Sequence, residues 1–488
     1  MSKLNQRAAD DPVLTSLATE KRPTSPIPFH QLHRVVGRYL EDREGYFQKL
    51  AAGLPAPRLV RLEFPVEPCE PLVWLSGQGA MPRAYWRDRQ QRVEIAGAGH
   101  CLSVSSTEPA DLNALFSQFR RWLATADPGL KFLGGLAFDL SRPSQDLWQP
   151  FGSYHFWVPQ LECGRRDNQG YFAVNLFLDP GLSSRSPVRV ALRLLSSTNG
   201  KESLLPAALP GIQQREDLPD LPGWGRAIQN VLDTIEHGNL EKLVLARQSR
   251  FVFQKEPDSL SLFHRLARAN PDAYQFYFQL EGGSAFLGCS PERLFRRSGR
   301  LLFTEAVAGT RPRGHTARED RELARQLLQS RKDRHEHFLV VKCILQGLER
   351  LCEKVESQNE PSVLKLARVQ HLASRFEGLL KPGVSDADIL ATLHPTPAVG
   401  GYPTRAALAT LRRLEPFHRG WYAGPVGWLG REEAEFAVGI RSGLFHQQEG
   451  YLYTGAGIVS GSSVQAEWNE IENKLANFLR IFEGEGDC

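Results

Sequence analysis

The stretch GAGIVSGSSVQAEWNEIENKLANFLRIF at residues 455–482 joins a small-residue segment, a Gly/Ser turn and an amphipathic helix. Ser462 and Gln465 have the spacing of a capping box, which predicts that the helix begins near residue 463. Its apolar side chains recur at helical spacing and predict one buried stripe: Trp468, Ile471, Leu475 and Phe478. The polar side chains Glu467, Glu470 and Lys474 share the neighbouring stripe, beside the glycine-rich turn.

These acidic residues have two readings. A solvated helix face with an ion pair between Glu470 and Lys474 explains them without any ligand. A second acidic pair, Asp333 and Glu336, lies in the first turn of an apolar helix, where acids also serve as partners of the helix dipole. If the two pairs converge, they offer the oxygen ligands that Mg²⁺ prefers, some bound directly and some through water. A glycine-rich turn at a helix N-terminus beside such a cation suits a carboxylate-bearing substrate.

Two short segments supply candidates for proton transfer. EKLVLAR (241–247) predicts a buried strand with Lys242 at its start, either as a solvated lysine or as an amine that a pocket keeps neutral to act as a base. LGCSPERLF (287–295) places Glu292 between a Ser-Pro turn and a strand. That carboxylate is either salt-bridged at the surface or buried and held protonated so that it can donate.

A third segment, TEAVAGTRPRG (304–314), is interpreted as a glycine-containing loop with two arginines. It is either a basic surface turn or a loop whose backbone N–H groups at Gly309 and Thr310 line an anion pocket. The chain contains no Walker loop, GxSxG elbow, HExxH or dinucleotide fingerprint. The residues alone therefore predict a magnesium site that binds a small carboxylic acid, with a lysine and a glutamate available for proton transfer.

Composition excludes several classes of protein. The 488 residues are 41% hydrophobic and 23% charged, as in an ordinary globular chain. The net charge of +4 arises from 59 basic and 55 acidic residues, and no concentrated basic stripe points to nucleic acid or a membrane surface. No apolar run is long enough to span a bilayer. Seven scattered cysteines without a CxxC pair, and no signal-peptide core in the first thirty residues, predict a cytoplasmic protein with reduced thiols.

The chain is expected to divide near residue 215. The predicted elements of the N-terminal half are strands at 59–66, 132–140 and 171–179 and a helix at 111–126. The stretch 195–223 is rich in Ser, Pro and charge and is the best candidate for a linker, followed by a helix over 224–240. The expected parts are a flexible segment (1–28), an N-terminal part (29–215) and a catalytic region (216–484).

Taken together, these segments closely resemble the chorismate-utilising enzymes, which comprise isochorismate, salicylate, anthranilate and aminodeoxychorismate synthases. They follow the family's order over roughly residues 224–480. The matching segments are KLVLAR, SPERLF, AVAGTRPRG, DRHEH, VQHLASRFEG (369–378), LHPTPAVGG (393–401), RGWYAGPVGW (419–428), EFAVGIRSGLF (435–445), GAGIV and EWNEIENK. The resemblance implies an α/β fold of the α+β type, built as one large unit with two stacked, mostly antiparallel sheets flanked by helices.

The resemblance also implies roles for individual residues. Glu336 and Glu470 would be direct Mg²⁺ ligands, with Asp333 and Glu467 behind them through water. Asp333 stands where some members have the longer Glu. The substrate's ring carboxylate would meet the ion, Gly455 and Lys474, and its enolpyruvyl carboxylate would meet Tyr422 and Arg441. The ring pocket would be lined by His371, Thr396, Gly309 and Thr310.

Three features sort the reactions within the family. Anthranilate synthases have Gln where Lys242 stands and use ammonia, so the lysine implies water as the nucleophile. Aminodeoxychorismate synthases typically have a nucleophilic Lys where this chain has Ala308, and the tryptophan-binding Leu-Leu-Glu-Ser type motif of anthranilate synthases is absent. Isochorismate synthase is therefore the leading interpretation. Salicylate synthase, which follows isochorismate formation with loss of pyruvate, is the alternative. A non-catalytic relative is disfavoured because the proposed positions are intact.

The implied reaction is an isomerisation in which Lys242 deprotonates water as it attacks C2 of chorismate and Glu292 protonates the departing 4-hydroxyl. The product would feed menaquinone or phylloquinone, or a siderophore or salicylate. The expected partner is chorismate alone, with no nucleic acid, membrane or glutamine amidotransferase subunit. The expected assembly is a monomer or homodimer.

Overall fold

The side chains of the strand at residues 274–279 point alternately into two hydrophobic clusters. In a computed structural model, which describes residues 23, 25–182, 186–196, 208–358, 360–367 and 369–482, Phe276 and Phe278 enter one cluster and Tyr277 enters the other. Trp86 and Tyr85 divide in the same way. Because successive side chains of a strand point to opposite faces, both faces of the sheet are buried. This burial explains why so many strands are apolar throughout.

The described strands form antiparallel pairs. They are β1 (Arg58–Val66), β2 (Arg83–Arg87), β3 (Val93–Ser106), β4 (Phe132–Leu136), β5 (Tyr154–Arg166), β6 (Gln169–Leu178), β7 (Ile212–Leu218), β8 (Lys242–Phe253), β9 (Tyr274–Gln279), β10 (Ala285–Ser290), β11 (Arg293–Ser298), β12 (Leu301–Pro312), β13 (Cys352–Ser357), β14 (Ser362–Lys365), β15 (Val369–Leu380), β16 (Gly401–Tyr402), β17 (Pro425–Leu429), β18 (Glu433–Val438), β19 (Ser442–His446) and β20 (Glu449–Ile458). The predicted α/β class with antiparallel strands is confirmed. Hydrogen bonds join all these strands in one network rather than two separate sheets. The reason is that long strands change neighbours: β5 pairs with β4 through one end and with β6 through the other.

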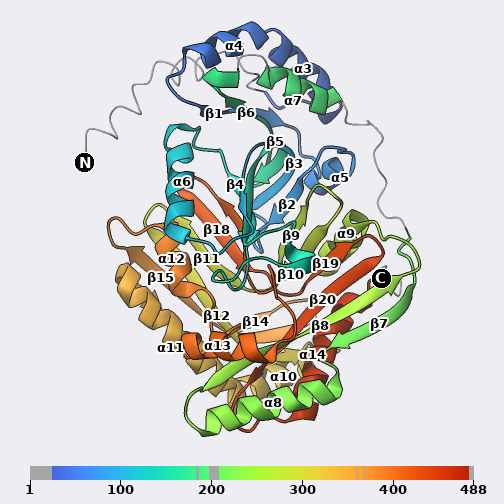
Figure 1. Ribbon diagram of the computed structural model, residues 1–488, viewed down its shortest axis with the longest axis vertical. Helices are drawn as coiled ribbons and strands as arrows, with labels where there is room; N and C mark the ends of the chain where they lie inside the picture. The colour runs from blue at the N-terminus through green and yellow to red at the C-terminus, as the bar shows by residue number, and fades with distance from the viewer. Residues whose placement is uncertain are drawn as a thin grey trace.

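Helices flank this network. They are α3 (Leu32–Glu41), α4 (Glu44–Gly53), α5 (Pro71–Ser76), α6 (Leu112–Thr125), α7 (Pro187–Ser196), α8 (Leu221–Glu236), α9 (Ser259–Ala269), α10 (Ala317–Gln329), α11 (Arg331–Leu351), α12 (Asp386–Leu393), α13 (Thr404–Leu414) and α14 (Val464–Leu479). Figure 1 shows α3, α4 and α7 gathered over β1 and β6 at one end, whereas α8, α10 and α14 lie at the other.

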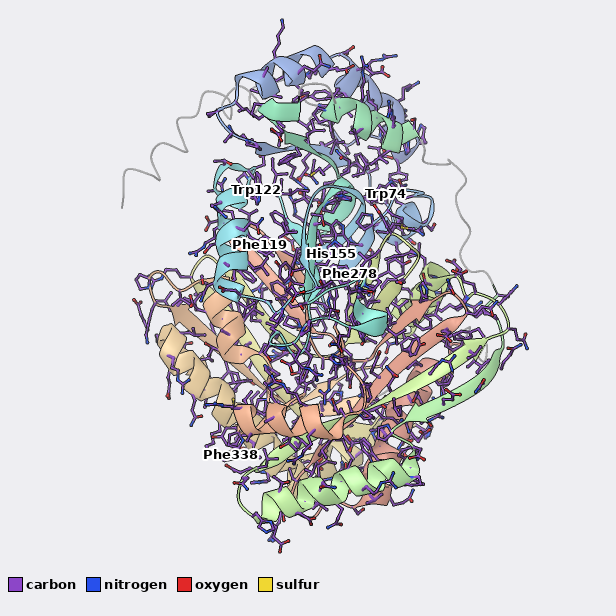
Figure 2. All side chains as sticks on the ribbon, viewed as in Figure 1. Trp74, Phe119, Trp122, His155, Phe278 and Phe338 are labelled. Atoms are coloured by element: carbon purple, nitrogen blue, oxygen red, sulfur yellow. The ribbon has the colours of Figure 1, made fainter. Side chains whose placement is uncertain are left out.

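The N-terminal elements follow the predicted pattern. β1, β6 and α6 match the expected ranges within two residues, whereas β4 ends at Leu136, so the strand predicted at 132–140 is four residues too long. Asp111 caps α6 by accepting from the backbone N–H groups of Asn113 and Ala114. Phe119 of α6, labelled in Figure 2, points toward the strands. It packs edge-on against Phe156 of β5. Most of the expected flexible segment, residues 1–22 and 24, lies outside the described residues, whereas Ile27 is buried and hydrogen-bonded to β1.

The linker predicted at 195–223 is wrong over part of its length. Residues 212–218 form β7, which pairs with β8. Its side chains are nearly all exposed and polar, so the strand carries no apolar signal in the sequence. Residues 197–207 of the predicted linker lie outside the described residues. The following helix, α8, begins at Leu221 with Asp220 as its cap, three residues earlier than expected.

Three local predictions also need correction. Residues 304–314 are largely strand β12 rather than a loop. A bulge between Ala308 and Thr310 accommodates Gly309 at a φ of 73°. The cap of α14 is Ser463, not Ser462, because Ser463 Oγ accepts from the Ala466 N–H. The apolar run from Phe338 onward predicts a helix central to the fold, yet Phe338 itself is 57% exposed on the outer side of α11 (Figure 2).

One negative finding concerns membranes. Among the residues that the structure describes, no helix has both the length and the apolar character needed to cross a bilayer.

Candidate active site

A cleft beside β12, β20, α11 and α14 collects most of the predicted site residues. It is lined by Glu292, Gly309, Thr310, Asp333, Glu336, His371, Tyr422, Arg441, Gly455, Glu470 and Lys474. The three remaining predicted residues, Lys242, Thr396 and Glu467, lie directly behind this lining. Lys242 contacts Glu336, Thr396 donates to Glu292, and Glu467 accepts from Lys332, which itself lines the cleft. Segments that are far apart in the sequence therefore meet in one place.

Lys242 is a fully buried amine at the first position of β8. Its Nζ lies 2.8 Å from Glu336 Oε1, yet no acceptor in the described residues is aligned for a hydrogen bond with it. Since a lysine ammonium has three donor positions, this buried nitrogen retains unused hydrogen-bonding capacity. The amine is thus available to a further small polar group such as water.

Gly457 makes room for this contact and is not among the predicted site residues. A Cβ atom there would lie 2.5 Å from Glu336 Oε1 and 3.1 Å from Lys242 Cε. The residue faces Val244 across the β8–β20 pair. The signal that was available is the alternation of glycines in GAGIV, since a small residue within a strand often marks a close approach by another group.

Glu292 is a buried carboxyl group at the cleft wall. Burial raises its pKa to about 8, and the negative charge of Glu305 adds to this effect. Lys242 and a hydrogen bond from Thr396 Oγ1, 3.3 Å from Glu292 Oε1, act in the opposite direction without outweighing burial. A carboxyl group in this environment is mostly protonated at neutral pH, which is the state that a proton donor requires.

His371 is held neutral in the cleft wall. Burial, followed by the charge of Arg441, lowers its pKa to about 3. Its Nδ1 lies 3.1 Å from the carbonyl oxygen of Gly309, which can only accept, so Nδ1 carries the hydrogen. The buried Nε2 has no partner in the described residues and is left as an acceptor.

Arg441 and Tyr422 provide a site for an anion. Arg441 lines the cleft, and burial lowers the pKa of its guanidinium. Within the described residues the structure records no hydrogen bond or ion pair for that guanidinium. Tyr422 stacks on Tyr453 with ring centroids 5.1 Å apart, which fixes the phenol beside it. A partly buried cation with free donors next to a phenol suits a carboxylate.

Each of the four acidic candidates contacts a different basic side chain. The pairs are Asp333 with Arg311 at 2.7 Å, Glu336 with Lys242 at 2.8 Å, Glu467 with Lys332 at 2.7 Å and Glu470 with Lys474 at 2.6 Å. The last pair is the one predicted along the helix face. Within the described residues, no three acidic, histidine or cysteine side chains stand close enough to hold a metal ion in this arrangement.

The electrostatic field of these four acids nevertheless favours a cation. Burial alone would lower the pKa of Lys332, but the hydrogen bond to Glu467 and the charges of Glu467, Glu470 and Glu336 raise it. One ammonium group thus lies in the field of three of the four candidate ligands. Carboxylate oxygens around a single positive charge are the donor set that Mg²⁺ prefers. The residues fit the ion, provided that it takes the place of the basic side chains.

Known proteins match the chain over most of its length. The family model described as "Chorismate binding enzyme" matches residues 47–483. Isochorismate synthase 2, chloroplastic, from Arabidopsis thaliana is 35% identical over 458 residues, covering 88% of this chain and 81% of that protein. Isochorismate synthase MenF from Escherichia coli is 32% identical over 451 residues, covering 91% of this chain and 98% of that protein.

A solved structure gives the same picture. The menaquinone-specific isochorismate synthase MenF from Escherichia coli superimposes with a TM-score of 0.79 at 29% sequence identity. The match covers 92% of this chain and 99% of that one.

Proposed function

The chain belongs to the chorismate-binding enzymes, and we propose that it is an isochorismate synthase that converts chorismate to isochorismate. Its similarity to isochorismate synthases extends over most of the chain. The observation that carries the proposal is the pairing, at one cleft, of a buried amine with spare hydrogen-bonding capacity and a carboxyl group whose pKa burial raises to about 8. Such a pair can remove a proton and deliver one in the same turnover.

Lys242 and Glu292 divide the proton transfers. Lys242, as the neutral amine, takes a proton from water while the water oxygen bonds to C2 of the chorismate ring. Glu292 gives its proton to the hydroxyl leaving C4, and the ring double bonds shift between the two carbons. Each transfer contributes roughly 10²–10⁴-fold to the rate. Substrate and product are isomers with similar bonds, so the reaction is expected to be reversible and close to balanced.

Two carboxylate sites orient the substrate. The unpaired guanidinium of Arg441 and the hydroxyl of Tyr422 bind the enolpyruvyl carboxylate. Lys474 of α14 and the backbone at Gly455 of β20 bind the ring carboxylate. The neutral His371 and the bulge at Gly309 and Thr310 line the ring pocket with Thr396. Fixing both carboxylates leaves the ring little freedom to turn, which favours attack at one carbon.

Mg²⁺ is the proposed cofactor. Glu336 and Glu470 would bind it directly, with Asp333 and Glu467 holding its water ligands. When bound, the ion supplies positive charge to the ring carboxylate and fixes its position. The basic partners of these acids, Lys332 above all, then turn to solvent or to the substrate.

The direct test is product identification by NMR after a short incubation with chorismate and Mg²⁺, with pyruvate followed in parallel by a coupled dehydrogenase. An isochorismate synthase gives isochorismate and no early pyruvate. Pyruvate formed in step with chorismate loss, together with salicylate, would instead identify a salicylate synthase. Binding of chorismate without turnover would contradict both and leave a non-catalytic relative.

The resemblance supports the finer assignments of partner and place. Because anthranilate synthases, which use ammonia, have Gln where Lys242 stands, we propose that this enzyme uses water and needs no glutamine amidotransferase subunit. The proposed assembly is a monomer or homodimer. The cysteines in the described residues are free, which supports a reducing compartment such as the cytoplasm. The isochorismate enters the formation of a quinone, as in menaquinone or phylloquinone, or of a siderophore or salicylate.

A further inference from the structure

The peptide that carries Glu292 is held on both sides by one buried ion pair. Arg89 Nη1 donates to the carbonyl oxygen of Pro291, immediately before Glu292, at 2.7 Å. Glu305 Oε1 accepts from the backbone N–H of Arg293, immediately after Glu292, at 3.0 Å. The free ends of the two side chains meet, because Arg89 Nη2 donates to Glu305 Oε2 at 2.7 Å. The contacts close a ring around the glutamate.

This ring joins distant parts of the chain. Arg89 lies in the turn between β2 and β3, in the N-terminal half, whereas Glu305 lies on β12. The same turn makes another contact, since Arg293 Nη2 donates to Gln90 Oε1 at 3.1 Å. The N-terminal half, in which the sequence shows no chemical constellation, therefore touches the turn that presents the proposed acid.

Stability alone does not account for such a pair. Arg89 is 9% exposed and Glu305 is 2% exposed, so both charges have been taken out of water. A buried ion pair is often no more stabilising than apolar residues of similar size. The planar guanidinium group of arginine, however, can donate to two acceptors in a fixed geometry, which a single ammonium group cannot do. The two side chains form hydrogen bonds with two backbone groups, one on either side of Glu292.

We propose that Arg89 and Glu305 are positioning residues for the acid step, which together hold the backbone on both sides of Glu292 and set the charge beside it. The inference rests on the proposed role of Glu292 as the proton donor. The groups that act on its carboxyl, by charge or by a hydrogen bond, are Glu305 on β12, Lys242 on β8 and Thr396. Of these, Glu305 raises the pKa of Glu292, whereas Lys242 and Thr396 lower it.

The first test separates positioning from folding. In Arg89→Met we expect kcat per folded molecule to fall roughly 10²-fold, as for a misplacement of about 1 Å, with KM for chorismate within about twofold. The matched control is Arg92→Met, in the same turn, whose side chain is exposed and, among the described residues, pairs only with Asp88. A fall in kcat at retained KM, absent from the control, supports the proposal. An unchanged kcat, or a loss confined to KM or to the folded fraction, overturns it.

The second test reads the charge of Glu305 directly and does not need Arg89→Met to fold. Glu305→Gln keeps an acceptor for the Arg293 N–H but removes the negative charge. We expect the alkaline limb of the kcat profile to move to lower pH. A limb that stays in place or moves to higher pH overturns the role of Glu305.

A third measurement distinguishes failure of this inference from failure of the proposed function. Infrared titration of the Glu292 carboxyl, identified by the band missing from Glu292→Gln, requires no turnover. A lower midpoint in Glu305→Gln than in the wild type supports the charge effect even if the protein releases no isochorismate. An unchanged midpoint in an enzyme that does make isochorismate overturns the inference alone.

Discussion

Two groups of buried charge in this protein differ in how completely their hydrogen bonds are satisfied. The first, here called the N-terminal charge cluster, consists of Arg61, Glu63, Glu162, Arg166 and Tyr171. Arg61 binds Glu162 through both terminal nitrogens, at 2.9 and 3.0 Å, and binds Glu63 through Nε at 2.9 Å. The Tyr171 hydroxyl donates to Glu162 at 2.7 Å. Burial opposes ionisation of Glu162, but Arg61 outweighs it and lowers the pKa of Glu162 to about 2.

The second group is the cleft around Lys242. It is equally buried, yet several of its polar atoms have no hydrogen-bond partner in the described residues: Lys242 Nζ, His371 Nε2 and Thr454 Oγ1. Its acid, Glu292, is shifted in the direction opposite to Glu162, toward the protonated form.

The difference separates a structural from a functional use of charge. In the N-terminal cluster each charged group is matched by another, so nothing is left for a ligand and the cluster can only stabilise the fold. In the cleft, unmatched buried groups cost stability, and this cost is recovered when a ligand supplies the missing partners. Perturbed pKa values alone would not distinguish the two groups, because structural ion pairs perturb them as well.

The largest effect expected from this comparison is a loss of turnover in variants of the cleft. Replacing Lys242 with Ala, or Glu292 with Gln, is expected to lower kcat by about 10²–10⁴-fold, because each removes one proton transfer. Neither variant should unfold, since neither group is fully matched in the native state. The measurement is steady-state production of isochorismate at saturating chorismate, with circular dichroism to monitor the fold.

Lys131 offers the matched control for Lys242. It is also a buried lysine, and burial followed by the charges of Arg166 and Arg61 lowers its pKa to about 8. It lies beside the N-terminal cluster rather than the cleft. Lys131→Ala should therefore keep wild-type kcat per folded molecule. If it lost activity as Lys242→Ala does, the division into structural and functional charge would be wrong.

The second expected effect is a loss of folding stability when the N-terminal charge cluster is disrupted. Glu162→Gln leaves the buried guanidinium of Arg61 without its bidentate partner, and we expect the free energy of unfolding to fall by about 3–5 kcal/mol. Chemical denaturation measures this. Activity per folded molecule at low temperature should stay unchanged. Glu322→Gln, which breaks an exposed pair with Arg325, serves as the control and should leave the unfolding midpoint in place.

The sequence predicts the catalytic half better than the N-terminal half for a physical reason. Residues that bind one small ligand recur in fixed local patterns, so Lys242 at a strand start and the acids three apart could be recognised. The partners in the N-terminal cluster are linked only by the fold. Arg61 and Glu162 are 101 residues apart. No local pattern couples them, just as none couples Arg89 to Glu305.

The errors in secondary structure have a common origin. Strand β7 is polar on both faces because it lies at the surface of the network, and β12 contains Gly, Arg and Pro, which are typical of turns. In both strands, pairing with a neighbour overrides the local preference. The cap of α14 differs by one residue from the prediction because Ser462 has a Gln at capping-box spacing, whereas the serine that caps the helix is Ser463, whose Oγ accepts from the Ala466 N–H.

A smaller expected effect concerns the affinity for Mg²⁺, and it tests whether the acids of the cleft form a metal site. Glu467→Gln alters a proposed holder of metal-bound water, so we expect the affinity for Mg²⁺ to fall by roughly 10–100-fold, with kcat partly restored at high Mg²⁺. Calorimetric titration with Mg²⁺ measures the affinity independently of turnover. Glu472→Gln lies on the same helix but pairs with Arg215 and Arg247 and is the control. Equal affinity in both variants would remove Glu467 from the metal site.

The smallest effect is the pH dependence near neutrality. The proposed role of Glu292 requires its protonated form, and burial raises its pKa to about 8, so the active fraction should decline as pH rises through that value. We expect kcat to fall about twofold between pH 7 and pH 8 and about fivefold between pH 8 and pH 9, approaching tenfold per pH unit beyond that. The wild-type profile of kcat from pH 6 to about pH 9.5 tests this, and the residual activity of Glu292→Gln should lack the transition. Glu162, with its pKa lowered to about 2, contributes nothing in that range. A rate that rises through pH 8 would mean that the ionised carboxylate is the working form, and Glu292 would then belong with the structural acids instead of the proton donors.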